Sequence, residues 1–188
     1  MSKGRVKPSL FTLSRESFAD EEEFNKFRDE ILGPSDRASA IIGAAYVERF
    51  LICLVQGKMK TLTKKESDAL FFEDKAILKT LSARIEIAAA LDAISKEQKA
   101  ALNSIRRVRN VFAHAVRPIT FEHELISAVC KTLPFSKTST LDVVLGPHRT
   151  IYVKCVARMM QEFSLLFARE PRAPAIRRLV SNPYLQEA

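Results

Sequence analysis

The chain has 188 residues, of which 47% are hydrophobic, and it carries only five glycines and a net charge of +8. This length predicts one domain that buries a substantial core without disulfide or metal support, and the three cysteines are too scattered for a zinc or redox site. No apolar run approaches the roughly 20 residues of a membrane-spanning helix, and no signal-peptide pattern follows the charged start. We therefore expect a cytoplasmic protein with no metal, no cofactor and no membrane contact.

The spacing of apolar residues, together with capping residues, prolines and glycines, predicts an all-α protein. The second of the expected helices is apolar around nearly its whole axis, which is typical of a helix at the centre of a core. Ser95 and Gln98 form a capping-box pattern, and Pro118 prevents further winding of the helix that they start. In chain order, the expected helices cover residues 16–32, 35–59, 64–71 (a short piece), 77–94, 95–116, 121–133 and 150–168.

These elements predict a single-domain bundle of about six helices over residues 1–170. Its first helix (16–32) is acidic, its core covers 35–133, and its last helix covers 150–168. Residues 134–147 are polar and contain two prolines and a glycine, which predicts a loop with room for one short extended segment at 141–145. A basic tail at 171–188 follows, and its prolines indicate that it is loosely held.

Arg84 falls within the apolar stripe of the helix expected at 77–94. Because an unpaired buried charge is very costly, one interpretation gives Arg84 a carboxylate partner on the second helix, either Glu48 or Asp36. In the other interpretation its long side chain reaches water at the edge of the stripe. The sequence leaves both open.

The segment Ser104–His114 carries three arginines, an amide and an imidazole. A guanidinium such as that of Arg109 binds a phosphate bidentately, and an imidazole such as that of His114 transfers a proton near neutral pH, which suits phosphodiester chemistry. On one ideal helix, however, the two residues lie roughly 140° apart. They converge only if the helix is distorted after Phe112, or if a second copy of the chain supplies one of them.

The same helix is expected to have two opposite faces. Its polar strip consists of Asn103, Arg106, Asn110 and His114, and its apolar face consists of Leu102, Ile105, Val108, Phe112 and Val116. In the plainer interpretation, His114 is only a residue near a helix C-terminus, and Arg109 pairs with the acidic first helix or with Asp36. The central positive charge of Arg106 and Arg107 favours an anionic partner, although solvated faces explain most such runs.

Three blocks of sequence occur together: Ser35–Ala45, Leu81–Leu91 with Ile94-Ser95, and Ile105–His114. In content and order they resemble the mannitol operon repressor (MtlR) family, over roughly residues 30–130. The last block also matches the Arg-x4-6-His signature of the wider HEPN superfamily of helical proteins, many of which are metal-independent ribonucleases. The resemblance implies an all-helical bundle, often dimeric, that is associated with transcriptional regulation and lacks a helix-turn-helix.

Carried over to this chain, the resemblance implies that Arg109 and His114 are the catalytic pair, with Asn110 supporting them. It also implies that Asp36, Arg37 and Arg84 are structural or line the site, and we add Arg106 and Arg107 as binding candidates.

Two hypotheses follow. The first is a transcription regulator that acts mainly through protein–protein contacts, as a homodimer with a protein partner. The second is a metal-independent endoribonuclease, a toxin or defence effector, whose partners are RNA and an antitoxin. A sequence-specific DNA-binding protein is a third, weaker hypothesis.

Overall fold

The computed structural model describes residues 29–33, 35–134 and 144–171, and all regular structure within these ranges is helical. The helices are α3 (Asp36–Lys58), α4 (Lys64–Phe71), α5 (Leu81–Ala90), α6 (Lys96–His114), α7 (Glu124–Lys131) and α9 (Pro147–Ala168). The prediction of an all-α helical bundle is confirmed. Most of the acidic first helix and the tail 172–188 lie outside the described residues, as does most of the loop; Val144 and Leu145 are helical rather than extended.

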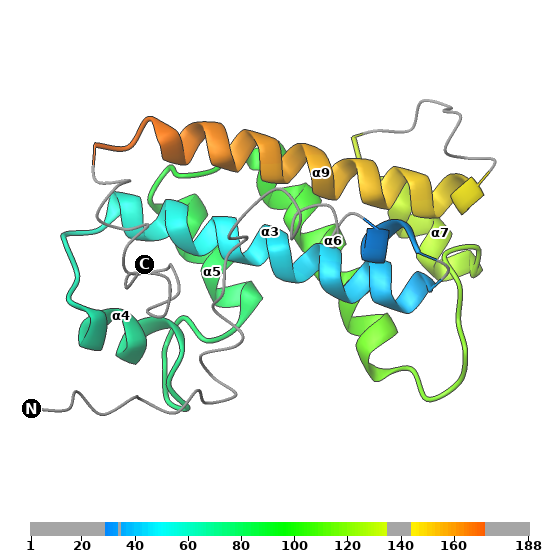
Figure 1. Ribbon diagram of the computed structural model, residues 1–188, viewed down its shortest axis with the longest axis horizontal. Coiled ribbons are helices and arrows are strands. Elements are labelled where there is room, and N and C mark those ends of the chain that lie inside the picture. The colour runs from blue at the N-terminus through cyan, green and yellow to red at the C-terminus, as the bar shows by residue number, and fades with distance from the viewer. Residues whose placement is uncertain (1–28, 34, 135–143, 172–188) are drawn as a thin grey trace, which may run out of the picture.

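The two longest helices, α3 and α9, lie side by side and run in the same direction, and α6 crosses behind them (Figure 1). Ion pairs fix both ends of this pair, with Arg149 against Asp36 at the start and Lys58 against Glu170, 2.6 Å apart, at the end. Near the start, a Cβ added at Gly43 would lie 3.3 Å from the Val156 side chain. Glycine therefore permits the close approach of α3 to α9.

The prediction that the second helix occupies the centre of the core is confirmed, because α3 packs against α5, α6 and α9. By length and composition alone, α3 is also long and apolar enough to cross a membrane, which differs from the expectation that no segment would be. However, 56% of the qualifying window is buried inside the molecule, as in a helix at the centre of a core.

Three helices, α5, α6 and α7, are shorter than predicted. The helix expected at 77–94 begins only at Leu81, since the side chain of Thr80 caps it, and it ends at Ala90, just before Asp92 adopts a positive φ of 51°. The helix expected at 95–116 ends at His114, and the prediction that Val116 belongs to its apolar face is wrong: Val116 is 99% exposed.

The ends of the remaining helices follow from their local sequence. The capping box of Ser95 and Gln98 is present as predicted. The helix expected at 121–133 is limited to Glu124–Lys131, with His123 as its N-cap. In contrast, α9 begins three residues earlier than predicted, because Gly146 adopts a φ of 79° and Pro147 then occupies the first helical position, where its missing N–H is not needed.

Candidate functional site

Helix α6 separates two openings on the surface. It is regular to its end, since the backbone N–H of Ala115 still donates to the carbonyl of Val111 at 2.9 Å. One stripe of the helix faces the core, as predicted, through Leu102, Ile105, Val108 and Phe112. Side chains on one flank of this stripe line a cleft rich in arginine, whereas those on the other flank line an apolar groove.

The first opening, which we call the basic cleft, has a volume of about 790 Å³ and lies among α3, α5 and α6. Its charged lining residues are Glu48, Arg49, Lys79, Arg84, Arg106 and Arg109. Five cations therefore share the cleft with one carboxylate. The candidates Arg109, Asn110 and Arg106 come together here because positions i, i+3 and i+4 occupy one face of a helix.

The single carboxylate of the basic cleft is already paired. The Nη1 of Arg84 donates to Oε1 of Glu48 at 2.5 Å, which confirms Glu48 as the partner of Arg84. Arg84 also donates to the carbonyls of Leu78 and Phe71, each at 2.6 Å, and its guanidinium lies 5.7 Å from the ring centre of Phe72. Burial raises the pKa of Glu48, although the charges of Arg84 and Arg109 oppose this shift. Arg84 is therefore a structural residue at the wall of the cleft.

Arg106 and Arg109 are the two arginines of α6 that line the cleft. Among the described residues, their side chains form hydrogen bonds only with neutral amides. Nη1 of Arg109 donates to Oδ1 of Asn110 at 3.1 Å, and Nη2 of Arg106 donates to Oδ1 of Asn103 at 3.3 Å. The Nε of Arg106 is buried and has no hydrogen-bond partner in the described part of the chain. These two guanidinium groups thus keep unused capacity to bind an anion.

His114 does not join Arg109. It is exposed, it does not line the basic cleft, and among the described residues its side chain makes no hydrogen bond. The helix between the two residues is regular, so the distortion that would bring them together is absent there, and they stay about 140° apart. Within one copy of the chain, the predicted catalytic pair does not converge on one small ligand.

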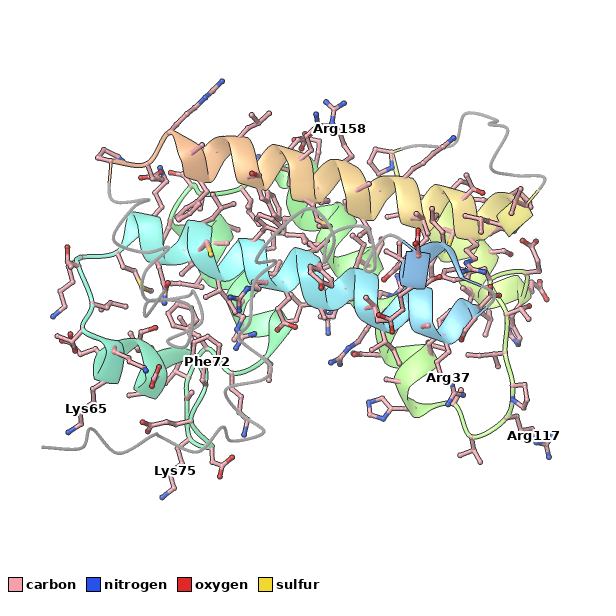
Figure 2. The ribbon with its side chains drawn as sticks, in the orientation of Figure 1. Arg37, Lys65, Phe72, Lys75, Arg117 and Arg158 are labelled. Carbon is pink, nitrogen blue, oxygen red and sulfur yellow. The ribbon has the colours of Figure 1, made fainter. Side chains whose placement is uncertain are left out.

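Asp36 and Arg37 hold the fold together. The carboxylate of Asp36 accepts the backbone N–H of Phe121 at 2.9 Å, and it pairs with Arg149 rather than with Arg109. Nη2 of Arg37 donates to the carbonyl of Ala115 at 2.7 Å, and Figure 2 shows Arg37 beside the end of α6. Both residues thus fasten the start of α3 to the chain that follows α6.

Arg149 is a buried cation that the sequence analysis missed. Only 4% of it is exposed, its Nε donates to Ser39 Oγ at 3.0 Å, and its Nη2 donates to the carbonyls of Ile31, at 3.2 Å, and Gly33. Burial lowers its pKa despite the neighbouring Asp36. No sequence pattern indicates this role, because Arg149 follows a loop and precedes the recognisable apolar pattern of its helix.

The second opening, which we call the apolar groove, lies between α6 and α7 and has a volume of about 510 Å³. Leu125 and Val111 line it and are 73% and 48% exposed. Arg107, one of the predicted binding residues, lines the same groove together with His123. Sequence reasoning missed this feature, because side chains of two helices form it and the pattern of neither helix alone indicates it.

No family model, no curated protein and no solved structure matches this chain. In the described residues, no group of three or more histidine, cysteine, aspartate or glutamate side chains is placed to hold a metal ion. The three cysteines are buried, and none of them forms a disulfide.

Proposed function

We propose that this chain is a transcription-regulatory protein of the mannitol operon repressor type, which acts by binding a protein partner. The observation that carries the proposal is the apolar groove between α6 and α7. Leu125 and Val111 are exposed there within a concave, largely apolar lining. Exposed apolar side chains gathered in a groove are typical of protein-binding surfaces.

The partner that suits this groove is an amphipathic helix with carboxylates beside its apolar face. A groove between two helices accepts the apolar face of a third helix. Arg107 lies at the groove, and the chain carries a net charge of +8, so acidic side chains flanking that face would be attracted to this surface.

The separation of Arg109 from His114 also favours a regulator over an enzyme. A ribonuclease that uses this pair needs both side chains at one phosphodiester, whereas a single chain holds them on different sides of a regular helix. A regulator has no such requirement.

The test is to delete the gene in its host, sequence the transcripts, and restore the gene as wild type or as variants. We expect the deletion to change a small, defined set of transcripts. A copy with Leu125→Asp should fail to restore them, because a carboxylate in the groove opposes an apolar partner with acidic flanks.

The matched control is Leu165→Asp, which places the same change at an exposed leucine of α9 outside the groove. This variant should restore the transcripts, as should His114→Ala. Full restoration by Leu125→Asp, with its folding and abundance verified, would contradict the proposal, as would a deletion that leaves the transcripts unchanged.

A second candidate function is a metal-independent ribonuclease that is assembled from two copies of the chain. The observation that favours it is the exposure of His114 at the end of α6, where no described residue accepts a hydrogen bond from it. In a homodimer, His114 of one copy would meet Arg109 of the other at the scissile phosphate. The 2′-oxygen would attack the phosphorus, the bond to the 5′-oxygen would break, and a cyclic phosphate would remain. His114 would either accept the proton of the 2′-hydroxyl or protonate the leaving oxygen, and DNA, which lacks this hydroxyl, would not be cleaved.

This candidate is tested with purified protein and mixed cellular RNA in EDTA. Cleavage with cyclic phosphate ends by the wild type, and by neither His114→Ala nor Arg109→Ala, would support it. Because the site needs two copies, an equimolar mixture of the two inactive variants should regain part of the activity. Intact RNA in every tube, or cleavage by the His114→Ala variant, would eliminate it.

A further inference from the structure

Among the described residues that line the basic cleft, cations outnumber carboxylates. Glu48, the only carboxylate in that set, accepts a hydrogen bond from Arg84 at 2.5 Å and is partly buried beside it. Lys79 pairs with Asp74, but that carboxylate is fully exposed, and such surface pairs contribute little. The cleft therefore has a net charge that an anion would balance.

Two helices, α6 and α5, supply hydrogen-bond donors to the lining of the cleft. Arg106 and Arg109 lie one turn apart on α6, and the buried Nε of Arg106 has no partner within the described residues. Opposite them, Leu81 and Ser82 line the cleft as the first two residues of α5. The first backbone N–H groups of a helix have no acceptor inside the helix, and this end carries a partial positive charge that favours anions.

The remaining lining is polar at Thr80, Ser82 and Asn110 and apolar at Ala45, Ile52, Phe71, Phe72 and Leu81. Of the apolar side chains, Ala45 is exposed and Phe72, labelled in Figure 2 at the end of α4, is partly buried, whereas the other three are buried. A ligand that is only an ion would leave Ala45 and Phe72 in contact with water. A ligand with an aromatic or aliphatic body next to its anionic group would cover them.

We propose that the basic cleft binds a small organic phosphate, with its phosphoryl group held by Arg106, Arg109 and the start of α5 and its apolar body against Phe72 and Ala45. A phosphate monoester carries up to two negative charges and three acceptor oxygens, which suits two guanidinium groups and a helix start better than a single carboxylate does. This inference concerns a different opening from the apolar groove and goes beyond the regulatory proposal.

The experiment is titration calorimetry of the full chain with phenyl phosphate, inorganic phosphate and phenol. Phenyl phosphate should bind at roughly sub-millimolar concentration. Inorganic phosphate should bind about tenfold more weakly, since it leaves the apolar walls uncovered. Phenol should give no measurable binding, because the cations would stay unpaired.

Arg106→Gln and Arg109→Gln should each weaken phenyl phosphate binding by about tenfold or more, the usual loss for one charge-assisted hydrogen bond. The matched control is Arg107→Gln, which removes the same charge from the same helix but lines the other opening. It should change the affinity less than about twofold, as expected for a screened charge. Thermal unfolding verifies that each variant is folded. Arg106→Lys keeps the positive charge but loses the planar pair of N–H donors, so its loss of phenyl phosphate affinity should be intermediate.

The proposal is overturned if phenyl phosphate does not bind, or if Arg107→Gln weakens it as much as Arg109→Gln does, since the effect would then be that of net charge. Equal affinity for phenol would also overturn it. So would a single-stranded RNA oligonucleotide that binds through Arg106 and Arg109 while phenyl phosphate does not, because the cleft would then serve a polymer.

Discussion

The carboxylate of Glu48 on α3 and the guanidinium of Arg84 on α5 lie 2.5 Å apart in a largely buried pair whose side chains are 19% and 8% exposed. Burial raises the pKa of Glu48 and lowers that of Arg84, so for both groups the loss of water outweighs their mutual attraction. The pair thus joins α3 to α5, and each partner supplies the counter-charge that the other needs in this largely buried position.

Removal of Glu48 or of Arg84 alone should therefore lower the stability of the fold. We expect Glu48→Ala to lower the free energy of unfolding by about 3 kcal/mol, because Arg84 would stay buried without a counter-charge. Urea denaturation at neutral pH measures this. The control is a double-mutant cycle with Arg84→Met, because Arg84 also donates to the carbonyls of Leu78 and Phe71 and its loss has a cost of its own. Glu48→Ala should cost less in the Arg84→Met background than in the wild type, and an equal cost in both would contradict the role of the buried charge.

The raised pKa of Glu48 also predicts a pH dependence. A carboxyl group whose pKa is higher in the folded state than its ordinary value of 4.5 adds stability below that value, and this contribution is lost as the pH rises through the folded pKa. Glu48→Gln cannot ionise. The difference in unfolding free energy between wild type and Glu48→Gln should therefore shift against the wild type as the pH rises from about 4 to 7. A difference that is constant over this range would contradict the assignment.

Arg149 should be essential to the joint between α3 and α9. Its guanidinium binds Asp36, Ser39 and the carbonyl of Ile31 at once. Arg149→Met keeps much of the volume but leaves these acceptors buried without donors, so we expect a loss of about 3 kcal/mol in unfolding free energy. Thermal and urea unfolding measure it, and Arg158→Met, a more exposed arginine of the same helix, provides the comparison. If Arg149→Met and Arg158→Met lower the unfolding free energy equally, the hydrogen bonds and ion pair of Arg149 are not the cause of the loss.

The cysteines should be inert in the folded protein. Burial raises the pKa of Cys130 and of Cys155 to about 12, and only the thiolate reacts with alkylating reagents. Native protein should therefore react slowly with a thiol-specific dye, and all three cysteines should react once the chain is unfolded in urea. Rapid labelling of Cys130 or Cys155 before unfolding would show that α7 or α9 opens locally.

The features that follow from local sequence were predictable. The apolar residues of α3 and the cap at Ser95 mark their elements regardless of what packs around them. For Arg84 the sequence left two interpretations open, a carboxylate partner (Glu48 or Asp36) or a side chain that reaches water, and the structure selects Glu48.

The two openings were not predictable, since neither belongs to one element. The basic cleft needs the start of α5 to face α6, and the apolar groove needs α7 to leave Val111 uncovered. The misplacement of Val116 has a similar origin: extrapolated periodicity continues the helix, whereas Arg37 holds the carbonyl of Ala115 where the chain turns away.

Helix α6 is a wall shared by both openings, with Arg106 and Arg109 on one side and Arg107 and Val111 on the other. A ligand that moves or stiffens this helix from one side changes the shape that the other side presents. Binding free energies at two linked sites are reciprocal, so an anion that strengthens partner binding must itself be held more tightly by the complex than by the free chain. Because one helix lines both openings, the affinity for a partner would then depend on the concentration of a small anion.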